Sequence, residues 1–112
     1  MPAIELYRVV RADDTHGLKA GQMVEAVRNT GPETLDDVIR GWVEQLTAQA
    51  VLSAGTTIAV HGDTATIRQP RQPEPDLTLG AGDWLVHART RLLVVTDDAF
   101  HEGFSSRWLS RA

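Results

Sequence analysis

Four arginine side chains have the clearest potential for binding chemistry in this 112-residue chain, whose formal net charge is −4. Arg68 and Arg71 lie in a proline-rich stretch, and Arg89 and Arg91 lie in a short polar connection between two apolar stretches. A guanidinium group is a planar fork of donors that matches phosphate and carboxylate oxygens. If the two segments meet in the fold, the four groups would bind a small phosphorylated, nucleotide-like ligand or an acidic protein surface. The alternative is that these arginines are scattered and only add solubility.

A second group of residue types suits a divalent metal ion. Asp98, His101 and Glu102 fall on adjacent turns of an expected C-terminal helix, and carboxylates and imidazoles are common ligands of such ions. This spacing raises the hypothesis of a small metal-dependent enzyme. The chain has no His-x-x-x-His spacing, and the same residues also fit a solvated helix face opposite Phe100 and Phe104.

His87 lies in a stretch whose alternation is typical of a strand. Its side chain is expected on the face opposite Trp84 and Val86, together with Leu85 and Arg89. In one interpretation this ionisable ring forms the edge of a ligand pocket beside the arginines. In the other it is a partly exposed strand histidine without a binding role.

Residue types for covalent catalysis are scarce. The chain has no cysteine, which excludes a thiolate metal site, a disulfide framework and a cysteine nucleophile. Ser105 and Ser106 lack the Gly-x-Ser-x-Gly context of a serine nucleophile. We therefore predict no catalytic residue and no cofactor, and the sequence favours a binding protein over an enzyme.

The composition is that of a globular protein, with 42% hydrophobic residues, and the length suits a single domain over residues 1–112. The negative net charge argues against general nucleic-acid binding, which requires Lys and Arg to neutralise phosphates. No apolar run approaches the ~20 residues of a membrane span. The N-terminus, MPAIELYRVV, also lacks the pattern of a signal peptide. We therefore expect a cytoplasmic protein with no membrane association.

Hydrophobic periodicity predicts one long amphipathic helix over residues 33–53. Thr30 and Glu33 have the spacing of a capping box at its start, and Gly55 is a plausible stop. Trp42 falls at the middle of the apolar face, so its side chain is predicted to be buried against a sheet.

A two-residue turn at residues 62–63 predicts a hairpin, because a glycine at the first turn position suits such loops. This turn pairs Val60 with Ala65 and Ile58 with Ile67, which gives one apolar face. The other strands are expected over residues 4–10, 22–27, 84–88 and 92–95.

These elements predict an α+β fold, with a small bent antiparallel sheet or barrel of five to six strands, one long helix and a short C-terminal helix. Phe100, Phe104 and Trp108 are spaced i, i+4, i+8, which puts three rings on one face of the last helix. We expect this face to dock on the domain or, if the core is too small to accept it, to form a homodimer contact.

The stretch from Gly82 to Phe104 resembles a pattern in small phage and prophage proteins. Those proteins carry Gly-Asp-Trp/Tyr-Ile-Val, a short hairpin and then Asp-x-Phe-x-x-x-Tyr. Here the matching residues are Gly82-Asp83-Trp84-Leu85-Val86, then Asp98-Ala99-Phe100 and Phe104. Phe104 stands in place of the tyrosine, and Arg89-Thr90-Arg91 in place of a glycine-containing turn.

The resemblance covers roughly 23 of the 112 residues and implies an origin in a phage or mobile element, with no enzymatic activity to transfer. Its residues are interpreted as structural, with Gly-Asp forming a turn and the aromatic rings packing. The leading hypothesis is therefore a non-catalytic accessory protein that binds a host protein in the bacterial cytoplasm, with an anti-defence role as one candidate.

Overall fold

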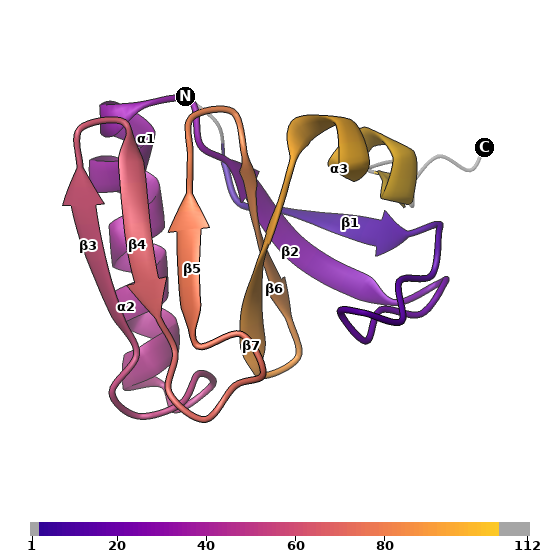
Figure 1. The fold of residues 1–112 in the computed structure, drawn as a ribbon, viewed down its shortest axis with the longest axis horizontal. Coiled ribbons are helices and arrows are strands. Elements are labelled where there is room, and N and C mark those ends of the chain that lie inside the picture. The colour runs from indigo at the N-terminus through magenta and orange to yellow at the C-terminus, as the bar shows by residue number, and fades with distance from the viewer. Residues whose placement is uncertain (1–2, 106–112) are drawn as a thin grey trace.

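Two antiparallel sheets organise the fold in this computed structural model, which describes residues 3–105 (Figure 1). The first sheet has five strands in the order β7-β6-β2-β1-β8, and the second has three in the order β3-β4-β5. The strand bounds are β1 Glu5–Val9, β2 Met23–Arg28, β3 Thr57–His61, β4 Thr64–Arg68, β5 Asp76–Leu79, β6 Trp84–Ala88, β7 Arg91–Val95 and β8 Phe104–Ser105.

The predicted α+β class is confirmed, with antiparallel strands, one main helix and the short C-terminal helix α3 (Asp97–Gly103). Residues 3–105 contain eight strands, more than the expected five to six, and the two that the sequence did not predict are β5 and the two-residue β8. β5 follows the proline-rich stretch directly. Its apolar side chains, Leu77 and Leu79, are both buried, so pairing with β4 completes a core that the local pattern did not reveal.

The main helix comprises α1 (Pro32–Thr34), a π-helical turn η1 (Leu35–Ile39) and α2 (Arg40–Ala48). The predicted capping box is wrong. Gly31 is the N-cap residue, and no side-chain hydrogen bond caps the helix there. The Thr30 hydroxyl bonds instead to the Thr34 hydroxyl. The Asn29 side chain accepts a hydrogen bond from the Gly31 N–H at 3.0 Å, and the N-cap lies one residue after the predicted Thr30.

The helix also ends earlier than predicted, at Ala48 and not at residue 53. Ala50 has a φ of 60°, and its N–H bonds to the Thr47 carbonyl at 3.1 Å. The N–H of Val51 then bonds back to the Leu46 carbonyl at 3.0 Å. This is the hydrogen-bond pattern of a Schellman motif, here with alanine at the position that usually holds glycine.

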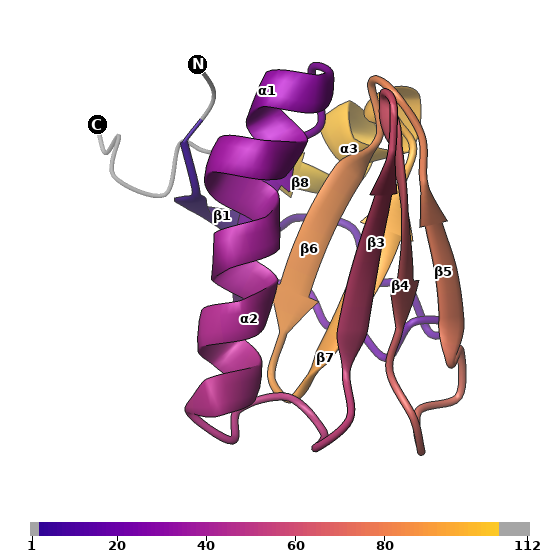
Figure 2. The same ribbon diagram turned by 90° about the vertical axis from the view of Figure 1, so that its left-hand side faces the viewer.

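The hairpin between β3 and β4 has the predicted register, with Val60 opposite Ala65 and Ile58 opposite Ile67. Gly62 has a φ of 65°, which explains the glycine at this turn. One hydrophobic core lies between this second sheet, the main helix and one face of the first sheet. The predicted burial of Trp42 in it is confirmed, since its side chain is 6% exposed. Figure 2 shows the main helix running alongside β6 and β3.

A second core, rich in aromatic rings, covers the opposite face of the first sheet. Trp84 and Phe100 stack with ring centroids 3.7 Å apart, and Tyr7 meets both rings edge-on. The Trp84 indole donates to Asp97 Oδ1 at 2.8 Å, and this hydrogen bond lowers the pKa of the Asp97 carboxyl. The aromatic residues of the C-terminal stretch therefore pack, and α3 is fixed to the sheet.

The C-terminal helix is shorter than the aromatic spacing predicted. It ends at Gly103, and Phe104 begins β8, where it pairs with Val9 of β1. Phe100 and Phe104 are nevertheless both buried, so they dock on the domain as expected. Trp108, the third residue of the predicted face, lies outside the described residues.

Candidate binding pocket

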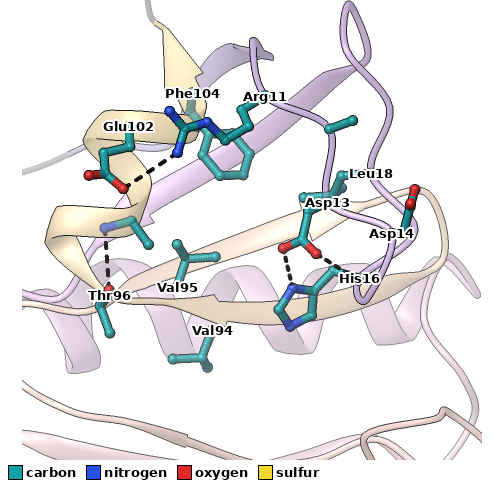
Figure 3. Close-up of a pocket in the computed structure, with 13 residues that line it drawn as sticks. Arg11, Asp13, Asp14, His16, Leu18, Val94, Val95, Thr96, Glu102 and Phe104 are labelled. Carbon is teal, nitrogen blue, oxygen red and sulfur yellow. Dashed lines mark hydrogen bonds and ion pairs between the residues drawn. The ribbon is translucent and has the colours of Figure 1, made fainter.

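A cavity of about 490 Å³ lies between the segment 11–18, α3 and the end of β7, and we call it the α3 pocket (Figure 3). Its wall is apolar where it meets the second core, and charged side chains surround that apolar part. The apolar residues are Leu18, Val94, Val95, Ala99 and Phe104, and the charged or ionisable ones are Arg11, Asp13, Asp14, His16 and Glu102.

The segment 11–18 is held in place by backbone hydrogen bonds and by one buried side chain. Asp13 and Leu18 exchange N–H to carbonyl bonds of 2.9 and 2.8 Å, which closes a tight loop. Gly17, with a φ of 69°, lets the chain turn there. The Leu18 side chain is buried, and the Arg11 N–H bonds to the Gly103 carbonyl of α3. Both walls of the pocket are therefore tied to the aromatic core.

His16 lies between two carboxylates at the edge of the α3 pocket. Its Nδ1 is 2.7 Å from Asp13 Oδ2, and its Nε2 is 3.4 Å from Glu74 Oε1. The hydrogen bond from His16 lowers the pKa of the Asp13 carboxyl. An imidazole with both nitrogens protonated can donate to both carboxylates. This trio therefore holds the segment 11–18 against the proline-rich loop that carries Glu74.

The rim of the α3 pocket carries more negative than positive charge. Asp13, Asp14 and Glu102 supply three carboxylates, against the one guanidinium of Arg11. Arg11 and Glu102 lie 3.8 Å apart with side chains 70% and 66% exposed, so their ion pair is weak and solvated. The pocket therefore presents an apolar interior with an acidic edge (Figure 3).

The three residues of the metal hypothesis turn to different surroundings. His101 Nδ1 lies 2.8 Å from the Asp97 carbonyl oxygen, Glu102 pairs with Arg11, and Asp98 is exposed. Among residues 3–105, no three His, Asp or Glu side chains are close enough together to hold a metal ion. Glu102 contributes instead to the edge of the α3 pocket.

The arginines of the sequence analysis separate into two places. Arg68 lies 3.8 Å from Asp76, with both side chains exposed, and Arg71 is also exposed. Arg89 and Arg91 line a second cavity of about 230 Å³, which we call the basic cavity. Its lining residues are His16, Gly17, Lys19, Gln22, Ala88, Arg89, Thr90 and Arg91.

His87 does not face the basic cavity. Its Nδ1 lies 3.1 Å from Glu25 Oε1, and its Nε2 lies 2.8 Å from the Arg89 carbonyl oxygen. The ring meets Trp42 edge-on, with centroids 6.1 Å apart. It lines a third cavity, of about 500 Å³, between the main helix and the first sheet. The structure thus puts His87 and Arg89 on different surfaces, although they are two residues apart.

Sequence reasoning missed His16, which lines both the α3 pocket and the basic cavity, and Lys19, which lines the basic cavity. The segment 12–17 was interpreted only as a turn-rich break. The spacing of Asp13 and His16 was an available signal, because an aspartate can accept hydrogen bonds from the third residue after it. No local pattern indicates that Lys19 lines the same cavity as Arg89 and Arg91, because this proximity depends on tertiary structure.

Comparisons with protein-family models, with curated proteins and with solved structures found no match. Within residues 3–105, no helix has the length and apolar character needed to cross a membrane.

Proposed function

We propose that this protein is a non-catalytic binding protein whose α3 pocket takes an apolar side chain of a partner protein, flanked in the partner by lysine or arginine. The observation that carries the proposal is the combination of an apolar interior with an acidic edge in one cavity of about 490 Å³. Cavities of roughly 300–1,000 Å³ with mainly apolar walls and a few polar groups are typical binding sites.

The chemistry of the partner follows from the two parts of the pocket. Leu18, Val95 and Phe104 offer contacts that favour burial of an apolar group. The carboxylates of Asp13, Asp14 and Glu102 favour a cationic neighbour and disfavour an acidic one, since charge complementarity mainly sets specificity and association rate. A basic, apolar segment fits both parts, whereas an acidic segment fits only the interior.

The resemblance of residues 82–104 to phage and prophage proteins supports the wider setting of the proposal. In that setting the protein is encoded by a phage or mobile element, and its partner is a protein of the bacterial host cytoplasm. A metal-dependent enzyme built on Asp98, His101 and Glu102 is not proposed, because these side chains turn to different surroundings.

A selection from a random peptide library displayed on phage tests the proposal, because such a library samples apolar, basic and acidic sequences alike. The immobilised full chain should enrich peptides that carry an apolar residue beside lysine or arginine. A parallel selection on Ala99→Arg, which fills the α3 pocket, should not enrich them. Ala48→Arg is the matched control, because Ala48 is also an exposed helical alanine but lies on the main helix. Enrichment of acidic peptides, or of the same peptides on the Ala99→Arg protein, would refute the proposal.

A further inference from the structure

Three cationic side chains line the basic cavity from two different loops. Lys19 comes from the segment that leads into β2, and Arg89 and Arg91 come from the hairpin between β6 and β7. Among the described residues that line this cavity there is no aspartate or glutamate. The site is separate from the α3 pocket, although His16 borders both.

These three cations have no acidic partner within the described part of the chain. Between residues 3 and 105, no carboxylate lies within ion-pair distance of Lys19, Arg89 or Arg91. Four other arginines in the same range do form ion pairs, namely Arg11, Arg28, Arg40 and Arg68. Like charges gathered on one cavity repel each other, and in a chain of net charge −4 acidic partners are plentiful. Within the described residues, the three cations of the basic cavity are therefore not neutralised by a direct ion pair.

The Arg91 side chain is held in position at this cavity. One of its terminal nitrogens, Nη2, donates to the His16 carbonyl oxygen. The same nitrogen lies close over Gly17, where a Cβ atom would be 3.3 Å from it. The φ of 69° at Gly17 is the stronger reason for a residue without a side chain at this position. The hydrogen bond of Nη2 leaves the other donors of the Arg91 fork for a ligand.

Arg89 occupies a backbone conformation that arginine rarely adopts. Its φ is 60°, and its carbonyl oxygen is 2.8 Å from His87 Nε2, which fixes the hairpin turn. Asparagine or glycine adopts this conformation at lower cost. This turn conformation holds Arg89 at the tip of the hairpin, where it lines the basic cavity.

We propose that the basic cavity binds the phosphate group of a small phosphorylated molecule, with Lys19, Arg89 and Arg91 as its cationic ligands. A phosphate group fits both the sign of the charge and the size of a cavity of about 230 Å³. The forked donors of arginine match the geometry of phosphate oxygens, and lysine adds a point charge. Gln22 contributes to the same wall, and its Oε1 accepts from the Lys19 N–H at 3.1 Å, which leaves its amide nitrogen as a further donor.

The test is a titration of the full chain at constant ionic strength. Binding is monitored through the amide chemical shifts in nuclear magnetic resonance spectra. The probes are inorganic phosphate and a nucleoside 5′-monophosphate, with sodium chloride as the reference salt. Both phosphates should cause saturable shifts at residues 16–22 and 88–91, whereas chloride should not. Tighter binding of the monophosphate identifies a phosphorylated molecule as the ligand, and equal binding identifies free phosphate.

Two double variants separate a specific site from a general effect of charge. Lys19→Gln with Arg89→Asn removes two cations from the basic cavity and should weaken phosphate binding by about tenfold or more. Arg68→Gln with Arg71→Asn removes two exposed cations elsewhere and should leave the affinity unchanged. The pair is matched, because Arg71 also has a positive φ, of 72°. Equal melting temperatures of the two variants confirm that both fold. Shifts no larger with phosphate than with chloride, or an equal loss in both variants, would overturn the proposal.

Discussion

The side-chain amide of Gln69 hydrogen-bonds to both backbone groups of Leu92. Gln69 Nε2 donates to the Leu92 carbonyl at 2.9 Å, and Gln69 Oε1 accepts from the Leu92 N–H at 2.9 Å. The Gln69 side-chain amide thus pairs with Leu92 of β7 as the backbone of a neighbouring strand would. Because Gln69 Nε2 also donates to the Glu74 carbonyl, the proline-rich loop is held beside β7 with Glu74 next to His16. This contact joins the two sheets and places Glu74 beside His16, which borders both proposed sites.

Replacing Gln69 by leucine should lower the free energy of unfolding by about 2–4 kcal/mol, because it leaves the Leu92 N–H and carbonyl without partners in a buried position. Urea denaturation followed by tryptophan fluorescence measures this loss. The control is Gln45→Leu, at an exposed position of α2, for which we expect a change within about 0.5 kcal/mol. Similar stability of the two variants would show that the Gln69 amide does not join the sheets.

Replacing Ala50 by glycine should raise the free energy of unfolding by about 0.5–1 kcal/mol, because glycine adopts a positive φ without the clash of a Cβ atom. The opposite sign is expected for Glu44→Gly in the interior of α2, where glycine costs about 0.5–1 kcal/mol. Thermal unfolding of both variants and of the parent protein measures whether the two substitutions change the stability in opposite directions. Destabilisation by Ala50→Gly would contradict the assigned end of the helix.

Replacing Asp13 by asparagine should destabilise the protein at pH 7, and the difference from the parent should disappear in acid. The His16 hydrogen bond lowers the pKa of Asp13 in the folded protein. The stability that a lowered carboxyl pKa supplies is present above its unfolded pKa of about 3.9 and is lost as the pH falls through the folded value. Urea denaturation at several pH values between 7 and 2 measures the difference. The exposed neighbour Asp14 provides the control, Asp14→Asn, and a difference that persists at pH 2 would contradict the assignment.

Replacing Trp42 by alanine should cost about 3–5 kcal/mol, a large part of the stability of a domain of this size. The indole is 6% exposed and packs with the core of the main helix and both sheets. A thermal melt within one or two degrees of the parent would show that this core does not depend on the ring.

The parts of the fold that the sequence predicted are those set by local rules. The hairpin register followed from the turn at Gly62, since a two-residue loop fixes which residues face each other. The main helix followed from its apolar periodicity. Its end did not, because the chain leaves the helix at Ala50, an alanine in a conformation that normally indicates glycine. β5 was missed because only Leu77 and Leu79 mark it after the prolines.

The candidate sites were harder to predict, because each combines loops that are distant in the sequence. Arg89 and Arg91 were selected for their chemistry, and the structure puts both at one cavity. Their third cation, Lys19, lies about 70 residues away in sequence, so no local pattern could assign it. The α3 pocket lies between the segment 11–18, the end of β7 and α3, and its lining residues form no sequence motif.

The affinity of a selected basic, apolar peptide for three versions of the protein is the most direct test of the proposed binding function. Isothermal titration calorimetry gives the dissociation constant for the parent, for Ala99→Arg and for Ala48→Arg. We predict that Ala99→Arg weakens binding by at least about tenfold, equivalent to ~1.4 kcal/mol, while Ala48→Arg binds like the parent. Equal affinity of all three proteins, or equal loss in both variants, would contradict binding at the α3 pocket.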